Sequence, residues 1–334
     1  MKNDAMKNAP AGENERPLML APAFKDYIWG GERLKRDWGK QTDLSPLAES
    51  WELSCHEAGP SVVASGEWAG RTLAQVLAAH PQFVGTKAEK AGEFPLLIKL
   101  IDAAGPLSVQ VHPDDDYAER VEHALGKTEM WYVVDADKGA RLRSGFAKQV
   151  TPAQYEASVA DNTITDLLAE YEIHPGDLFF LPAGRVHSIG AGAFIAEIQQ
   201  TSDITYRIYD FNRKDADGNT RELHTELAKG AIDYTVLPDY RTHYQKAQDR
   251  EVELVSCPYF TTSLYDLTEA QTIDYSALDS FVVVICVEGK GTLCDDSGNE
   301  MPIHQGETVL LPATVKSLRV IPGGNLKMLT SYIK

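Results

Sequence analysis

Two blocks of sequence occur twice in this 334-residue chain, in the same order, and this repeat limits the folds that the chain can adopt. Residues 130–139 (MWYVVDADKG) are similar to 282–291 (VVVICVEGKG), and 174–183 (HPGDLFFLPA) are similar to 304–313 (HQGETVLLPA). An ordered repeat predicts two copies of one structural unit. The first copy is longer between its blocks, by about the length of a helix predicted over 151–171, so we expect a helical insertion there.

Both copies have the pattern of β structure. Short runs of Val, Ile, Leu, Tyr and Phe, each closed by Gly, Pro, Asp or Asn, are typical of an all-β sandwich or barrel. The clearest runs lie at 94–101, 107–112, 129–136, 177–183, 193–200, 204–211, 281–293, 307–313 and 325–333. The best helical segment is 151–171, where Thr151 is the predicted cap and Pro152 occupies the first turn.

The first copy contains the pattern Gly-Asp-x-x-x-x-Pro-Ala-Gly-x-x-His after an upstream His and Glu, and this resembles the cupin jelly roll. A jelly roll is a double-sheet β structure whose interior can hold a ligand. The expected fold class is therefore mainly β, with two cupin-type jelly-roll units and a small helical insertion in the first. We expect a disordered tail over 1–20, a catalytic cupin domain over 21–245, and a degenerate cupin domain without metal over 250–334.

Composition excludes several classes of function. A formal net charge of -17 argues against nucleic acid or an anionic membrane as a partner. The chain has no apolar run long enough to span a membrane and no secretory signal pattern at its start, so a cytoplasmic location is expected. The four cysteines form no CxxC pair, which favours free thiols over a cysteine metal site.

Several polar residues of the first copy are placed to hold a metal ion. Alternate residues of a strand share a face, so Ser108, Gln110 and His112 point the same way, as do Lys127 and Glu129. His187 follows the Pro-Ala-Gly turn, and Glu197 lies on the next strand. Two imidazoles and one carboxylate from three strands can converge on a divalent ion, with the Gln110 oxygen as a fourth ligand.

Each of these residues alone has an ordinary structural explanation. His112 alone would be a strand-end histidine, Glu129 a solvated strand start, and Gln110 the partner of a buried backbone group. Their joint occurrence at cupin positions favours the metal site. The second copy has no histidine in 312–317, after its Pro-Ala turn, and Ser280 and Phe281, the counterparts of the Glu129 region, offer no carboxylate, so no metal is expected there.

Four segments are similar to the type I mannose-6-phosphate isomerases in their short bacterial form. They are SVQVHP (108–113), GKTEMWY (126–132), PAGRVHSIG (182–190) and EIQQTSDITYRIYD (197–210), supported by YIWGG (27–31) and ESWELS (49–54). The resemblance runs from about residue 23 to the C-terminus. It implies an enzyme that interconverts mannose 6-phosphate and fructose 6-phosphate, and hence a small phosphosugar as substrate.

The resemblance also implies roles for single residues. One zinc ion per chain would be held by Gln110, His112, Glu129 and His187. Arg207 would be catalytic, and the substrate pocket would be lined by Lys99, Ser108 and Lys127. Longer relatives carry a separate helical domain that this chain is too short to contain, so the elements that cover the substrate do not carry over.

Arg207 and Lys99 lie in apolar strands, and a buried cation needs a partner or a functional role. For Arg207 the alternative to catalysis is a structural ion pair with Asp203 or Asp210. Several cations directed at one cavity would bind a phosphate despite the negative charge of the chain.

Aldose–ketose isomerisation moves a proton between C1 and C2 through an enediol, which requires a base and a countercharge for the developing oxyanion. The candidates for the base are Glu197, a metal-bound water and a histidine released from zinc. Two other functions fit the same residues less well, a non-haem iron cupin oxygenase and a non-enzymatic sugar-binding cupin.

Overall fold

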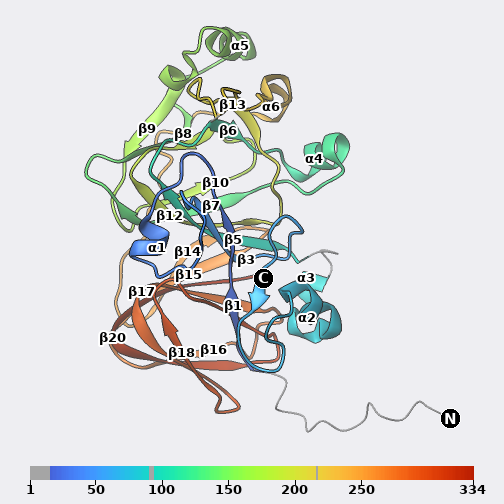
Figure 1. Cartoon of the computed structure of the whole chain (residues 1–334), viewed down its shortest axis with the longest axis vertical. Helices are drawn as coiled ribbons and strands as arrows, with labels where there is room; N and C mark the ends of the chain where they lie inside the picture. Colours follow the sequence, from blue (N-terminus) through green and yellow to red (C-terminus); the bar gives the residue numbers. More distant parts are fainter. Residues whose placement is uncertain (1–15, 90–93, 216) are drawn as a thin grey trace, which may run out of the picture.

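Two β units lie one above the other in the computed structural model, which describes residues 16–89, 94–215 and 217–334 (Figure 1). The upper unit comes mainly from the green and yellow part of the chain and the lower unit mainly from the orange and red part. In the described part of the chain, no helix has the length and apolar character needed to cross a membrane. The mainly β fold class is confirmed.

The upper unit consists of two sheets. The strands of its six-stranded sheet are, in order, β10 (Leu178–Leu181), β7 (Glu129–Ala136), β12 (Ala193–Gln200), β5 (Leu96–Ala103), β3 (Glu49–Leu53) and β2 (Ala23–Lys25). Those of its five-stranded sheet are β13 (Tyr206–Tyr209), β6 (Val109–Val111), β11 (His187–Ile189), β8 (Arg141–Phe146) and β9 (Leu168–Glu172).

The lower unit is one curved nine-stranded sheet. Its main path runs through β14 (Glu251–Ser256), β15 (Thr261–Leu267), β20 (Ser317–Tyr332), β17 (Val282–Asp295), β19 (Thr308–Leu311), β1 (Leu18–Ala21) and β4 (Val62–Val63), while β16 (Gln271–Asp274) pairs with β20 and β18 (Glu300–His304) pairs with β17. The pairing of β17 with β20 shifts register twice, and Gly289 has a φ of 78° within it. Such bulges bend long strands, so the sheet can curl around its own core.

The sequence repeat corresponds to a repeated strand pair. The repeated blocks form β7 and β10 in the upper unit and β17 and β19 in the lower unit, and each pair is antiparallel. The repeat therefore predicts the arrangement of strands as well as their presence.

Strand alternation gives the six-stranded sheet two different faces. Leu96, Ile98 and Leu100 of β5 belong to a large apolar core that also contains Phe281 and Ile285 of the lower unit. The residues between them point to the opposite face, the inside of the upper unit, because successive side chains of a strand alternate. One sheet therefore joins the two units and also forms one wall of the interior where the metal site is expected.

The N-terminal segment belongs to both units. β1 pairs with β19, although β1 and β19 lie near opposite ends of the described chain (Figure 1). The prediction of a tail over 1–20 extends too far, because β1 begins at Leu18; residues 1–15 lie outside the described residues. The partner strand β19 lies far from β1 in sequence, and this is why no local pattern predicts the pairing.

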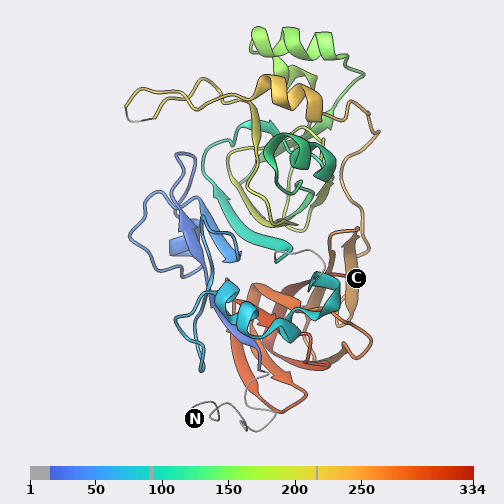
Figure 2. The ribbon, with the colours of Figure 1, turned by 90° about the vertical axis from the view of Figure 1, so that its right-hand side faces the viewer.

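Helices are short and lie at the edges of the sheets (Figures 1 and 2). They are α1 (Arg33–Arg36), α2 (Leu73–Ala79), α3 (Gly85–Glu89), α4 (Asp115–Glu122), α5 (Pro152–Ala160) and α6 (Thr225–Ala231), with 3-10 turns η1 (Pro81–Phe83) and η2 (Ile164–Leu167). Both α2 and α3 lie beside the lower unit.

The helix predicted over 151–171 is shorter than expected. Its start is correct: the Thr151 side chain accepts a hydrogen bond from the Gln154 N–H, and Pro152 is in the first turn. The helix ends after Ala160, and Asn162 takes a positive φ of 57°. The remainder of the range forms η2 and β9, because pairing with β8 outweighs the local helical pattern.

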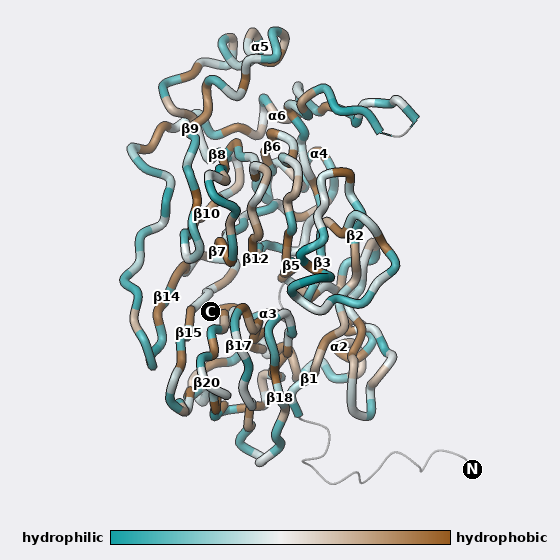
Figure 3. The backbone as a smooth tube through the Cα atoms, turned by 60° about the vertical axis from the view of Figure 1, so that its left-hand side comes forward, coloured by the Kyte–Doolittle hydropathy of each residue, from teal (hydrophilic) through white to brown (hydrophobic). Residues whose placement is uncertain are grey.

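Hydropathy along the chain agrees with this division. In Figure 3, brown hydrophobic stretches recur along the strands, whereas several connecting loops are teal. Phe194 of β12 illustrates the apolar face, because it is fully buried and stacks on Trp38 at a centroid distance of 4.6 Å.

We expect Phe194→Ala to lower the free energy of unfolding by about 3–5 kcal/mol, because it leaves a cavity in the core that the two units share. Urea unfolding measures the change. The control is Leu237→Ala, where the side chain is 38% exposed and the expected effect is within about 0.5 kcal/mol. Equal stability of the two variants would contradict a core shared between the units.

Candidate active site

Three buried side chains meet at one point in the upper unit: His112 directly after β6, Glu129 at the start of β7 and His187 at the start of β11. The ligand atoms of His112, Glu129 and His187 lie within 4.8 Å of one another, and no other described group of three or more His, Cys, Asp or Glu does so. Oε2 of Glu129 is 3.5 Å from Nε2 of His112, and Oε1 is 3.4 Å from Nε2 of His187. The predicted convergence of these three residues is confirmed.

Hydrogen bonds fix both imidazoles in the form that binds a metal. Nδ1 of His112 is 2.7 Å from the Ile204 carbonyl oxygen, and Nδ1 of His187 is 2.8 Å from that of Arg185. A carbonyl oxygen only accepts, so each Nδ1 carries the hydrogen and each Nε2 directs a lone pair at Glu129.

When Glu129 is ionised, as metal binding requires, the atoms of this cluster that face one another are all acceptors. Nε2 of His112 and both carboxylate oxygens of Glu129 are buried and have no hydrogen-bond partner among the described residues. Buried acceptors without partners are unfavourable, and a divalent cation between them would satisfy all of them together. The residues present therefore fit a metal ion.

Burial keeps the two histidines neutral. It lowers the pKa of His187 to about 4, and it lowers the pKa of His112 well below its usual value with help from Lys127 and the other imidazole. Burial, together with repulsion from Glu197, raises the pKa of Glu129 to about 8, although Lys127 acts in the opposite direction. Metal binding needs neutral imidazoles, and this environment supplies them at neutral pH.

Gln110 lies beside this cluster. It is directly opposite His187 in the pairing of β6 with β11, and its Nε2 is 3.3 Å from Nε2 of His187. Its Oε1 accepts a hydrogen bond from Ser108 Oγ at 3.1 Å. Gln110, the predicted fourth ligand, thus lies next to the cluster with its amide nitrogen rather than its oxygen turned toward it.

A lysine between two carboxylates forms the next layer. Nζ of Lys99 is 3.1 Å from Glu197 and 3.7 Å from Glu49. Glu197 also accepts a hydrogen bond from Trp131 Nε1 at 2.8 Å. Burial alone would raise the pKa of Glu197, but Lys99, Lys127 and the hydrogen bonds outweigh it and lower that pKa to about 2. Glu197 is therefore fully ionised at neutral pH and is a weak base.

Arg207 lies next to Gln110 in the pairing of β13 with β6. Its Nη1 donates to the Glu222 carbonyl oxygen at 2.8 Å, and its Nε is buried without a hydrogen-bond partner in the described chain. No ion pair joins Arg207 to Asp203 or Asp210 in the described chain: Asp210 is paired with Arg213 and Arg221, and Asp203 lies 3.7 Å from His56.

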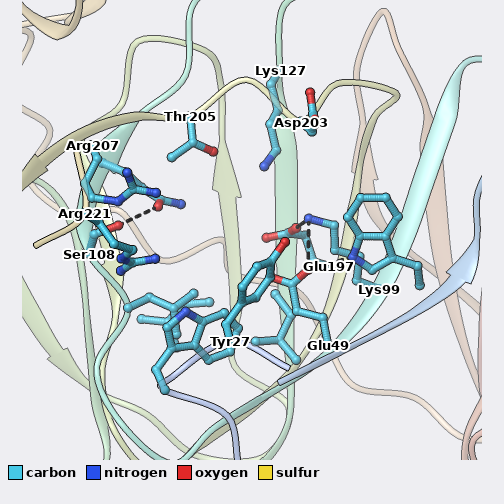
Figure 4. Close-up of a pocket in the computed structure, with 16 residues that line it drawn as sticks. Tyr27, Glu49, Lys99, Ser108, Lys127, Glu197, Asp203, Thr205, Arg207 and Arg221 are labelled. Carbon is cyan, nitrogen blue, oxygen red and sulfur yellow. Dashed lines mark hydrogen bonds and ion pairs between the residues drawn. The ribbon is translucent and has the colours of Figure 1, made fainter. Parts of the chain in front are cut away.

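These side chains line a cavity of about 250 Å³ (Figure 4). Arg207, Arg221 and Ser108 lie on one side of it, and Lys99, Glu197 and Glu49 lie on the other. Of the residues predicted to be catalytic or to contact the substrate, all five line the cavity: Arg207, Glu197, Lys99, Ser108 and Lys127.

Sequence reasoning assigned no role to several other residues of this cavity. These are Tyr27, Trp29, Glu49, Trp51, Ile101, Leu107, Ile189, Thr205 and Arg221, while Asp203, considered only as an ion-pair partner of Arg207, also lines the cavity. The alternation Glu49-Ser-Trp51 gave a usable signal, because both residues point to the face of β3 that also presents Lys99 of β5. Arg221 lies in a loop, where no periodicity indicates its direction.

Comparison with known proteins gives a consistent result. The sequence profile of the phosphomannose isomerase type I catalytic domain matches residues 18–147, and that of the mannose-6-phosphate isomerase cupin domain matches residues 250–333. The mannose-6-phosphate isomerase ManA of Bacillus subtilis is 36% identical over 300 residues, which cover 89% of this chain and 93% of that protein.

Two further relatives extend the match. A mannose-6-phosphate isomerase of Streptococcus mutans is 35% identical over 317 residues, covering 95% of this chain and 98% of the relative. The crystal structure of the mannose 6-phosphate isomerase from Bacillus subtilis superposes with a TM-score of 0.85 at 31% identity, covering 95% of this chain and 99% of that one.

The raised pKa of Glu129 predicts how the stability of the chelated protein depends on pH. The folded state holds this proton up to about pH 8, whereas a free glutamate loses it near 4.5. Tighter binding of this proton by the folded state therefore contributes fully to stability below pH 4.5, and this contribution is lost as the pH rises to 8. We expect the melting temperature of the chelated protein to fall across this range, and to fall less in Glu129→Gln.

The surface variant Glu253→Gln is the control for this measurement, because its side chain is 53% exposed. It should follow the wild-type curve. Identical curves for Glu129→Gln and the wild type would contradict the assignment.

Proposed function

Because this chain belongs to the type I mannose-6-phosphate isomerases, we propose that the cavity described above is its active site and that a zinc ion binds at its base. The enzyme interconverts mannose 6-phosphate and fructose 6-phosphate. The observation that carries the proposal is the set of buried, unpartnered acceptors on His112 and Glu129. They lie directly behind the cavity wall, because Lys127, which lines the cavity, is 3.4 Å from Glu129.

The proposed ligands are Gln110, His112, Glu129 and His187. Two neutral imidazoles and a carboxylate suit zinc, which prefers four nitrogen, oxygen or sulfur ligands. Gln110 would contribute its oxygen after the amide group turns about its last rotatable bond, which exchanges the places of oxygen and nitrogen. Its present bond to Ser108 is between neutral groups and is readily replaced.

When bound, a zinc ion supplies a Lewis acid for the carbonyl or the adjacent hydroxyl of the sugar. Arg207 then provides the fixed positive charge for the enediolate oxygen, because its Nε is unpartnered and lies beside Gln110. Ser108 and Lys127 line the path between these groups and orient the hydroxyls of the substrate.

We assign Glu197 to positioning rather than to proton abstraction. A carboxylate with a pKa of about 2 is too weakly basic to remove a proton from carbon efficiently. Its bonds to Lys99 and Trp131 instead hold both side chains at the cavity wall. Lys99, whose pKa is raised by Glu49 and Glu197 against the effect of burial, remains a cation that can contact the substrate.

Membership of this family also decides between the functions that the sequence left open. An isomerase is favoured over a cupin oxygenase and over a sugar-binding protein without activity. We propose further that the 250–334 unit binds no metal, because its interior is packed with apolar residues such as Val284, Leu293 and Leu318. The four free thiols support a cytoplasmic location.

Removal of the metal tests the proposal directly. We expect one zinc ion per chain by elemental analysis, and a loss of turnover on the order of a hundredfold or more after chelation or in His187→Ala. The surface variant His243→Ala should keep both metal and activity, because its side chain is 77% exposed. Full activity in metal-free protein would contradict the zinc site.

The role of Arg207 predicts a specific kinetic result. An interaction made mainly in the transition state lowers kcat and kcat/KM together, so Arg207→Ala should lose roughly a hundredfold to a thousandfold in both while keeping its metal. Lys99→Ala and Lys127→Ala should act more on KM. Arg319→Ala, at an exposed position of the lower unit, is the control. A normal kcat with a lowered melting temperature in Arg207→Ala would show a structural role instead.

A further inference from the structure

Two arginines share one buried carboxylate directly after β13, and a third arginine lies nearby. Asp210 is 5% exposed and accepts hydrogen bonds from Arg213 and Arg221. These bonds hold the pKa of Asp210 below its usual value, although burial acts in the opposite direction. Arg207 lies nearby and has no ion pair of its own in the described chain. Burial and the nearby charge of Arg221 lower its pKa from the usual value. This side of the cavity therefore carries excess positive charge.

The positive charges of the lysines in the cavity are already paired with carboxylates. Lys99 lies within 3.7 Å of Glu49 and 3.1 Å of Glu197, and Nζ of Lys127 is 3.4 Å from Glu129. On the other side, Arg213 and Arg221 share the single carboxylate of Asp210 and Arg207 has no ion pair among the described residues, so positive charge remains there although the whole chain carries a net charge of -17. The arginine side of the cavity is the place where an anion would bind.

Asp210 orients Arg221 with part of its guanidinium free. Nε and Nη2 of Arg221 donate to the two oxygens of Asp210 at 2.8 and 2.5 Å. Nη1 has no hydrogen-bond partner among the described residues, so its two N–H groups remain available. Arg221 lines the cavity, whereas Arg213 does not line it and donates to the Pro106 carbonyl oxygen.

The location of Arg221 matches the length of the substrate. In Figure 4 its side chain lies beside Ser108, below Arg207. Ser108 is two residues before Gln110 on the same segment. It therefore lies roughly 7 Å farther along an extended chain, on the side of Gln110 opposite to His112. A hexose 6-phosphate reacts at C1 and C2 and carries its phosphate on C6, at the opposite end of the molecule.

We propose that Arg221 binds the phosphate group of the substrate and determines the preference of the enzyme for phosphorylated sugars. Asp210 holds the guanidinium in place, and Nη1 donates to the phosphate oxygens. This inference rests on the metal end of the active site proposed above. Arginine suits the role because its planar fork matches the spacing of phosphate oxygens.

The test compares Arg221→Gln with Arg213→Gln, since both remove one partner of Asp210 but only Arg221 lines the cavity. Steady-state kinetics with mannose 6-phosphate and with unphosphorylated mannose give the selectivity, and inhibition by inorganic phosphate gives its inhibition constant. In Arg221→Gln we expect the KM for mannose 6-phosphate and the phosphate inhibition constant each to rise about tenfold to a hundredfold. The selectivity for mannose 6-phosphate over mannose should fall by a similar factor. Arg221→Lys should be intermediate.

Arg213→Gln should keep the selectivity and the phosphate inhibition constant near those of the wild type. Equal losses for both substrates in Arg221→Gln, or an unchanged phosphate inhibition constant, would overturn the proposal. A defect of the same size in Arg213→Gln would show that the Asp210 cluster acts only on structure, and would overturn it too. Failure of the proposed metal site is distinguishable, because it would appear as turnover without metal in the wild type while the phosphate constants still differ between variants.

Discussion

The carboxylate of Glu129, fully buried between two neutral imidazoles, is the constraint on which the site depends. Burial and the nearby carboxylate of Glu197 both disfavour its negative charge, so a bound cation would stabilise its ionised form. The surrounding residues favour a metal ion as that cation. Backbone carbonyls hold each Nδ1–H, which leaves the other nitrogen of each ring free to bind. Lys127 reduces the electrostatic cost without filling the place of the ion, because its Nζ stays 3.4 Å from the carboxylate.

The six-stranded sheet allows this polar interior to exist inside a stable protein. Its outer face packs on the lower unit through residues such as Ile98 and Ile198, which frees the inner face to carry Lys99 and Glu197. Buried charges of this kind contribute little stability on their own. The apolar contact between the two units supplies stability instead. The lower unit thereby supports a reaction although, in the described part of the chain, none of its residues lines the cavity.

Much of the site follows from strand periodicity. Alternation alone places Gln110 with His112 and Lys127 with Glu129, and the Pro-Ala-Gly turn brings His187 to the same interior. Loops and distant pairings are different, because their positions depend on contacts between residues far apart in the sequence. Arg221, for example, lies in a loop and is held at the cavity by its hydrogen bonds to Asp210.

The same limit explains the two errors in the fold. The predicted helix ends early because the later residues of its range pair with β8, and the predicted tail is too long because β1 pairs with β19. In both places the local pattern is real, but a partner strand elsewhere decides the outcome. The ion pair considered for Arg207 fails for a related reason, since two arginines from the following loop occupy Asp210.

The pairing of β1 with β19 has a consequence for how the chain folds as it is made. During synthesis β1 leaves the ribosome long before β19, so its edge stays unpaired until nearly the whole chain has emerged. Contacts between residues so far apart in sequence slow folding, because a large loop must close before the contact forms. Until then the edge of β1 that faces β19 has free backbone hydrogen-bonding groups, although its other edge can already pair with β4. A free strand edge of this kind can pair with other chains. Chaperone binding to this early segment would protect the nascent enzyme from aggregation.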